Sequence, residues 1–181
     1  MRKGDWIQTY MGIHMYPFDP IADEICIEDI AHSLSLICRY GGHCEQFYSV
    51  AEHSVLCSQY CNEKLRFPAL MHDASEAYIA DICRPVKRSM PQYQEIERML
   101  MTAIGEKFHI AYEDFDAVKE IDDIILATEA VQVFRGGICS WTWNPEKTAL
   151  PIKLMFLSPK DAEKIFLDRF KQLQYEKGDG K

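Results

Sequence analysis

Hydrophobic positions recur at intervals of three and four residues over most of this chain, which is the spacing of one face of an α-helix. The first such stretch begins at Ile27 and carries Ile30 and Leu34 on one face. We expect this helix to stop at the glycine pair at residues 41–42. Before it, residues 1–20 mix aromatic and β-branched residues with glycine and proline, which predicts a short hairpin or an extended arm.

The same spacing and the residues that begin helices predict several further helices. Ser49 and Glu52 form the capping box that often opens a helix, and we expect this helix to run toward Tyr60. Ser158 followed by Pro159 is typical of the start of a last helix. The other predicted elements are helices at 67–78, 91–108 and 118–134, a loop that contains Pro85, and an end of the last helix near residue 175.

Length and composition fit one globular domain. The chain has 181 residues, of which 48% are hydrophobic and 27% are charged. We therefore expect a compact, nearly all-α domain over residues 1–181, with a core at about 27–134. An irregular segment and a helix at 135–175 complete it.

The charge and the apolar runs exclude several classes of partner. The formal net charge of −8 disfavours binding to long nucleic acid, because that affinity comes from lysine and arginine. No apolar run approaches the roughly 18 residues that a membrane helix needs. Since the N-terminus also has no secretory signal, we expect a cytoplasmic protein with no membrane partner.

Seven cysteines occur without any C-x-x-C spacing, so free thiols are expected. Cys57 and Cys61 lie four residues apart on a predicted helix. As zinc ligands they would need two more cysteines or histidines at finger-like spacing, and none is close in the sequence. We therefore expect both to be buried small apolar residues.

Three predicted helices carry polar residues that an apolar core disfavours. These are His53, the pair His72 and Asp73, and the pair Asp122 and Asp123. A carboxylate beside apolar packing must be paired, bound to a metal, or raised in pKa. Two imidazoles and two carboxylates suit a borderline divalent ion such as manganese, cobalt, nickel, iron or zinc. The residues alone leave open whether they bind metal or form hydrogen bonds in the core.

Two more carboxylates follow closely. Glu76 lies four residues after His72 and is expected on the same helix face, and Asp81 falls just past the predicted helix end. A carboxylate beside a metal-bound water can act as a general base or acid. The basic residues Lys87 and Arg88 can receive phosphate oxygens or be solvated, and for Arg88 we favour solvation.

The order His53, His72–Asp73, Asp122 resembles the H…HD…D signature of the HD-domain metal-dependent phosphohydrolases. The segment LMHDASEAYIADICRPVK is similar to the bacterial 5'-deoxynucleotidases of this family. The block EDIAHSLSLICRYGGH…FYSVAEHSV is more similar to phage and prophage members, among them dATP triphosphohydrolases. This resemblance covers nearly the whole chain and implies the helical bundle of an HD domain.

The resemblance also implies roles for individual residues. Asp122 rather than Asp123 matches the family's ligand, because the ligand stands seven residues before the glutamate of A-T-E, here Glu129. Tyr40 stands where relatives often have another aromatic residue beside the nucleotide, which leaves the base preference open. The full set of implied roles is metal ligands His53, His72, Asp73 and Asp122, catalytic carboxylates Glu76 and Asp81, and substrate-binding residues Arg39, Tyr40 and Lys87.

The activity implied by the resemblance is hydrolysis of deoxynucleotides, in which a metal-activated water attacks the α-phosphorus. The products are phosphate from a dNMP or triphosphate from a dNTP such as dATP, and the sequence does not separate these outcomes. The implied cofactor is a divalent ion (Co, Mn, Zn, Ni or Fe), with Mg possible at a second phosphate-side site, and the implied assembly is a homo-oligomer, a dimer or a hexamer. The alternatives are a catalytically silent HD module that binds a nucleotide as a sensor, and an HD phosphodiesterase or nuclease.

Overall fold

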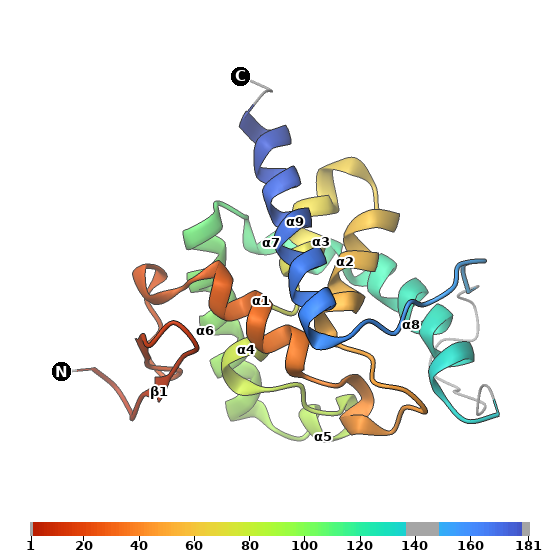
Figure 1. Ribbon diagram of the computed structural model, residues 1–181. Coiled ribbons are helices and arrows are strands. Elements are labelled where there is room, and N and C mark those ends of the chain that lie inside the picture. The colour runs from red at the N-terminus through yellow and green to blue at the C-terminus, as the bar shows by residue number, and fades with distance from the viewer. Residues whose placement is uncertain (1, 137–148, 179–181) are drawn as a thin grey trace.

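The computed structural model describes residues 2–136 and 149–178. Over these residues the chain is mostly helical with a short N-terminal hairpin, which confirms the predicted fold class (Figure 1). The hairpin pairs β1 (Ile7–Gln8) with β2 (His14–Met15) in antiparallel register, so that Ile7 lies opposite Met15. Much of the predicted irregular segment, including Trp141 and Trp143, lies outside the described residues.

Helices fill most of the remaining chain, and short 3₁₀ turns connect several of them. The 3₁₀ turns are η1 (Ala22–Glu24), η2 (Arg39–Gly42) and η3 (Glu63–Leu65). The α-helices are α1 (Ile27–Leu36), α2 (Val50–Tyr60), α3 (Arg66–Met71), α4 (Glu76–Ile79), α5 (Arg84–Lys87), α6 (Pro91–Phe108), α7 (Tyr112–Ala117), α8 (Lys119–Val133) and α9 (Pro159–Gly178).

The predicted start of α2 is confirmed, although only half of the capping box forms. Ser49 Oγ accepts a hydrogen bond from the Glu52 amide at 3.1 Å, as an N-cap serine does. The Glu52 carboxylate does not return to the cap. It accepts the amides of residues 155–157 at 2.9–3.1 Å and thereby fixes the segment before α9 to α2.

The first predicted helix is wrong at its end, because α1 stops at Leu36, before the glycine pair. The following residues are extended and pair with the segment before α2. The Arg39 amide donates to the Tyr48 carbonyl at 2.9 Å, and the Val50 amide donates to the Ile37 carbonyl at 3.1 Å. This pairing places Arg39 beside the start of the second helix.

The helix predicted over residues 67–78 is broken into α3 and α4. Between them the chain forms a tight turn, in which the amides of Ala74 and Glu76 each bond to the carbonyl three residues earlier. The loop predicted around Pro85 is also wrong, because Pro85 lies in the first turn of α5. The sequence pattern gave no indication of α7.

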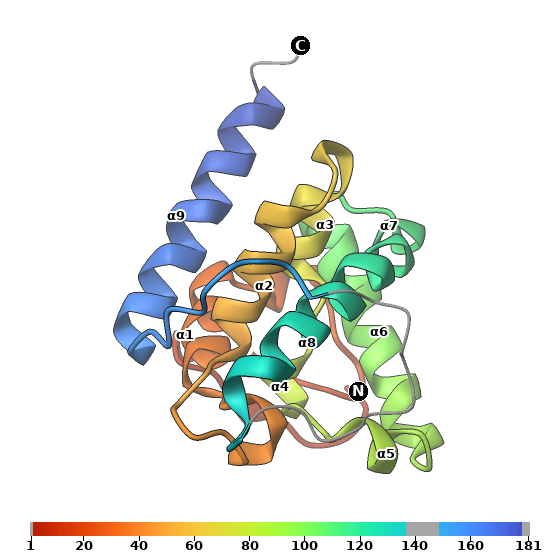
Figure 2. The ribbon, with the colours of Figure 1, turned by 90° about the vertical axis from the view of Figure 1, so that its right-hand side faces the viewer.

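α2 lies at the centre of the bundle. It packs against α1, α3, α8 and α9, and Figure 2 shows it between α9 and α8. Its residues 50–58 are all buried. Because such a helix has no side facing water, its polar residues Glu52 and His53 must find partners inside the protein.

Buried hydrophobic residues form two clusters on either side of this central helix. One cluster includes Ile30, Leu34, Leu70, Leu100 and Phe166, and the other includes Tyr48, Cys57, Ile125 and Leu154.

None of the helices in the described residues combines the length and apolar composition that crossing a bilayer requires.

Candidate metal centre

The predicted ligands meet where α2, α8 and the turn after α3 approach one another. His53 lies in the buried part of α2, and His72 and Asp73 lie in the turn that follows α3. Asp122 lies in the first turn of α8, where the helix dipole favours a carboxylate. The fold therefore brings together four side chains that are separated by up to 69 positions, from 53 to 122, in the sequence.

Hydrogen bonds orient both imidazoles in the same way. His53 Nδ1 lies 2.6 Å from Glu129 Oε1, and His72 Nδ1 lies 2.8 Å from the Ala69 carbonyl oxygen. Since a carbonyl and a carboxylate can only accept, each Nδ1 is the donor. In the neutral rings, each Nε2 is therefore unprotonated.

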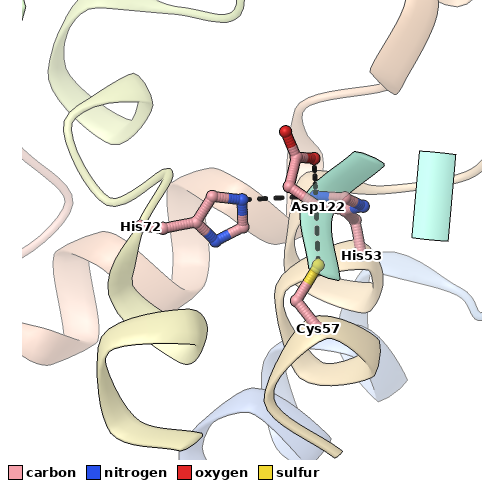
Figure 3. A group of neighbouring side chains, drawn as sticks. All are labelled: His53, Cys57, His72 and Asp122. Carbon is pink, nitrogen blue, oxygen red and sulfur yellow. Dashed lines mark hydrogen bonds and ion pairs between the residues drawn. The ribbon is translucent and has the colours of Figure 1, made fainter. Parts of the chain in front are cut away.

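The two Nε2 atoms face each other at 3.4 Å. Figure 3 shows His72, Asp122 and Cys57 all directed toward this nitrogen of His53. Lone pairs that face each other at this distance repel unless a metal ion or a proton lies between them. Metal-bound histidines usually donate their other nitrogen to a carboxylate or carbonyl, as both rings do here.

The separations between the donor atoms fit one small cation. Asp122 Oδ1 lies 3.3 Å from His53 Nε2, and Asp73 Oδ2 lies 3.3 Å from His72 Nε2 and 3.7 Å from His53 Nε2. One donor atom from each of His53, Cys57, His72 and Asp122 lies within 4.8 Å of all the others. This cluster of nitrogen, sulfur and oxygen donors could hold a divalent metal ion.

Cys57 is the member of this cluster that the sequence analysis did not identify as a ligand. It is buried, as predicted, and its Sγ lies 3.5 Å from His53 Nε2. Burial raises the pKa of this thiol to about 11. The sequence signal was the four-residue spacing from His53, which places both side chains on one face of α2.

Without metal, protons compete for the same donors. Burial and the charge of Arg39 alone would lower the pKa of His53, but Cys57, Glu129 and Asp122 raise it well above its usual value. For Asp122, burial alone would raise the pKa, and the interactions with His53 and His72 lower it. A metal ion must therefore displace a proton from His53.

Glu129 is fully buried and contacts His53 at Nδ1, the ring nitrogen that faces away from the cluster. It accepts hydrogen bonds from the hydroxyls of Tyr40 and Tyr48, and its Oε2 pairs with Arg39 at 3.2 Å. Burial alone would raise the pKa of Glu129, but Arg39 and His53 lower it to about 2. The carboxylate is thus ionised and holds His53 in the orientation that points Nε2 into the cluster.

Arg39 links Glu129 to the predicted ligands. Its guanidinium is only 12% exposed and lies 3.5 Å from Asp73 Oδ2. Its Nε is buried without a hydrogen-bond partner among the described residues. Tyr40 was predicted to lie beside a nucleotide, and its hydroxyl is bonded to Glu129 while its ring meets Phe134 edge-on at 5.0 Å between centroids.

The two predicted catalytic carboxylates lie in an acidic environment. Glu76 is buried, and its Oε2 has no hydrogen-bond partner among the described residues. Burial, together with the charges of Asp73 and Asp81, raises the pKa of Glu76 well above its usual value. Burial also raises the pKa of Asp81, and the charge of Arg39 opposes this shift. Both shifts favour the protonated form of these groups compared with an exposed carboxylate.

Lys87 was predicted to face phosphate, and its ammonium is paired with Glu97 on α6. Arg84 lies 3.4 Å from Asp122 Oδ2 and 3.5 Å from Asp123 Oδ1. The roles of these cations toward a substrate stay predictions.

A cavity of about 240 Å³ lies beside the cluster, with His72 and Asp122 in its wall. Other wall residues come from α6, α7 and α8. They include Gln94, Arg98, Tyr112, Phe115 and Lys119. A ligand in this cavity would touch two of the predicted metal ligands.

Comparison with known proteins identifies relatives along most of the chain. This chain is 42% identical over 173 residues to "Uncharacterized protein YfdR" of Escherichia coli (strain K12). The matched region covers 93% of this chain and 95% of that protein. The chain belongs to the YfdR family. It is also 32% identical over 145 residues to "Uncharacterized protein RCAP_rcc00048" of Rhodobacter capsulatus, covering 72% of this chain and 74% of that protein. No family model matches the chain, so HD-domain membership stays a prediction.

Proposed function

We propose that this YfdR-family protein is a metal-dependent phosphohydrolase of deoxynucleotides. The observation that carries the proposal is the pair of Nε2 atoms of His53 and His72, which face each other at 3.4 Å while each Nδ1 donates to an acceptor outside the cluster. Donor atoms arranged in this way could hold a metal ion. The neighbouring carboxylate Glu76, whose Oε2 lacks a partner among the described residues, supplies a group for proton transfer.

The proposed ligands are His53, His72, Asp73 and Asp122, and a divalent ion bound there would polarise a phosphoryl oxygen and lower the pKa of a water. Arg39, directed into the site, pairs with a non-bridging oxygen of the α-phosphate and stabilises its charge. Of Glu76 and Asp81, one carboxylate orients the attacking water and takes its proton. A carboxylic acid then returns a proton to the leaving 5'-oxygen of the sugar.

The bond that breaks joins the α-phosphorus to this 5'-oxygen, so a monophosphate gives phosphate and a triphosphate gives triphosphate. The charges near the site favour the monophosphate. Among the described residues, Lys87 is paired with Glu97 and Lys119 with Asp123. Each further phosphate group would have to compete with one of these pairings, of which the pair of the exposed Lys119 with Asp123 is the weaker.

A dATP-type triphosphate is the second candidate substrate, and the cavity beside the cluster favours it. Arg98 and Lys119 both belong to the wall of this cavity, which adjoins His72 and Asp122. If these side chains leave their carboxylate partners when substrate binds, they can receive the outer phosphates.

The decisive experiment is product analysis with protein of measured metal content. Protein loaded with manganese, cobalt or zinc is incubated with each dNMP and each dNTP, and phosphate is separated from triphosphate. We expect phosphate from monophosphates, whereas triphosphate from dATP would support the second candidate. No product from fully loaded protein contradicts hydrolysis, and nucleotide binding in equilibrium dialysis would then indicate a silent binding module.

Glu76→Gln separates chemistry from metal binding. The amide keeps the shape of the side chain but cannot take a proton, so we expect kcat to fall by roughly 10²- to 10⁴-fold. Metal content should stay unchanged, because Glu76 is not one of the proposed ligands. Glu63→Gln, at an exposed position in η3, is the matched control and should keep full activity. If Glu76→Gln and the control have equal kcat, Glu76 has no catalytic role.

A further inference from the structure

We propose that Cys57 is itself a ligand of this metal centre and makes it select a thiophilic ion, such as zinc, cobalt(II) or iron(II), over magnesium and manganese. The inference rests on the metal centre of the proposed function but not on its reaction. It assigns a role to a buried thiol that the hydrolytic mechanism does not use.

The position of Cys57 follows from the helix that carries it. Cys57 and His53 lie one turn apart on α2, so their side chains share one face. Both side chains are fully buried. Figure 3 shows the sulfur directed toward the same nitrogen of His53 that His72 and Asp122 approach from other directions.

The separations between His53 Nε2 and the other three donor atoms are close to those around a tetrahedral zinc ion. Bond lengths of about 2.3 Å to sulfur and 2.0–2.2 Å to nitrogen or oxygen place a sulfur–nitrogen pair roughly 3.6 Å apart and nitrogen–nitrogen or nitrogen–oxygen pairs roughly 3.4 Å apart. From His53 Nε2, the observed distances are 3.5 Å to Cys57 Sγ, 3.4 Å to His72 Nε2 and 3.3 Å to Asp122 Oδ1. The remaining donor pairs lie within 4.8 Å of each other, so one ion can contact all four donors once the side chains draw together around it.

Two ligand sets share His53, His72 and Asp122 and differ in the fourth donor. The cluster whose donor atoms all lie within 4.8 Å of one another contains Cys57 and not Asp73. Asp73 Oδ2 lies farther from His53 Nε2, at 3.7 Å, and also faces Arg39 at 3.5 Å. With Cys57 the set has two nitrogens, one sulfur and one oxygen, which favours thiophilic ions. As the sulfur–metal bond forms, the thiol proton passes to solvent.

Packing is the competing explanation, because Cys57 also belongs to the buried cluster that contains Tyr48 and Ile125. A thiol that only fills space would leave the metal's spectrum and selectivity unchanged when it is replaced. Replacement by serine keeps nearly the same volume, so it separates the two explanations.

The test is the absorption spectrum of the full-length protein loaded with cobalt(II). A thiolate ligand gives a charge-transfer band in the near ultraviolet, which we expect in the wild-type protein and not in Cys57→Ser. Cys61→Ser is the matched control and should keep the band, because the Cys61 thiol lies one turn farther along and contacts the Ser58 carbonyl. Cobalt that binds without this band, or that does not bind, overturns the inference.

Metal competition gives a second readout. Loss of a residue that only hydrogen-bonds a metal ligand typically weakens metal binding by roughly 10- to 100-fold. We expect Cys57→Ser, which loses a ligand itself, to weaken zinc binding by at least this factor and manganese binding by much less. Equal losses for both ions overturn the inference, and circular dichroism of the metal-free variant checks that it folds. A retained cobalt band without nucleotide hydrolysis would contradict the proposed function alone. Hydrolysis without the band would contradict the role of Cys57 alone.

Discussion

Glu129 is the residue on which most of the buried polar side chains around the candidate site converge. It bonds to two tyrosine hydroxyls and to His53, and it neutralises the buried guanidinium of Arg39. A fully buried carboxylate with these partners is ionised because they stabilise its charge. Its removal would take away the nearer of the two carboxylates that pair with the guanidinium of Arg39 and leave Asp73, at 3.5 Å.

We therefore expect Glu129→Gln to be destabilised by about 3–5 kcal/mol at neutral pH, because one partner of a buried ion pair is lost. The pH dependence should change as well. The folded-state pKa of Glu129 is lowered from 4.5 to about 2, so its contribution is present above pH 4.5 and is lost as the pH falls toward 2. Urea unfolding of both proteins at several pH values measures both effects.

Glu113→Gln is the control for this comparison, since Glu113 is exposed on α7. The control should unfold like the wild-type protein at every pH. A difference between Glu129→Gln and wild type that does not shrink between pH 4.5 and 2 would contradict the assignment of this acid sensitivity to Glu129.

The sequence predicted those site residues that form the H…HD…D signature along the chain. His53, His72 and Asp122 each stand out as polar residues in apolar helical segments, and the structure brings them together. The sequence did not reveal that Cys57 and Glu129 both lie beside the His53 imidazole. Cysteine and a single glutamate in a helix are compatible with many environments, and only the packing of α8 against α2 shows what each one touches.

Among the elements, long helices with a continuous apolar stripe were predictable and short ones were not. The bounds of α6 at Pro91–Phe108 agree with the prediction because both its first-turn proline and its stripe are local features. α5 and α7 are too short for a helical period to show. The turn between α3 and α4 contains His72 and Asp73, and the helical spacing of the apolar residues around it gave no sign of the break. The contacts of α4 with distant elements were not predictable either, among them the hydrogen bond from Ser33 on α1 to the Ala77 carbonyl at 3.0 Å.

A substitution at Glu52 tests how α2 is joined to the segment before α9, which is distant in sequence. Glu52→Gln replaces a carboxylate that accepts three amides with a side chain that offers one acceptor oxygen. We expect a loss of about 1–3 kcal/mol in the free energy of unfolding, because part-buried amides lose their acceptor. Limited proteolysis should also cleave faster near residues 155–157.

The control for this variant is Glu106→Gln, at an exposed position of α6. It should leave both the unfolding free energy and the cleavage rate unchanged. Wild-type cleavage kinetics in Glu52→Gln would show that the segment before α9 is held by other contacts.

For the whole molecule, metal binding should stabilise the fold, because the proposed ligands come from three separate elements. An ion that binds the folded chain and not the unfolded one adds RT ln(1 + [M]/Kd), or about 2.7 kcal/mol at a free metal concentration 100 times Kd. We expect chelation to lower the melting temperature and zinc or cobalt to restore it. The effect should be smaller at low pH, because His53 must lose a proton to bind metal.

His72→Ala is the variant that should abolish this response, because it removes one of the proposed ligands, a side chain that is 10% exposed. Scanning calorimetry with and without chelator compares it with the wild-type protein. An equal metal-induced shift in both proteins would place the ion elsewhere on the molecule.

The position of α9 also bears on how the chain is made. This helix packs on α1 and α2, and its Arg169 donates to the Ser58 hydroxyl and carbonyl at 3.0 and 2.8 Å. A ribosome releases these residues well after α1 and α2 have emerged. Until then the nascent chain exposes apolar surface, and Glu52 lacks its partner amides. The bundle is therefore completed only after α9 has been translated, and until then a chaperone can bind at the surface that α9 later covers.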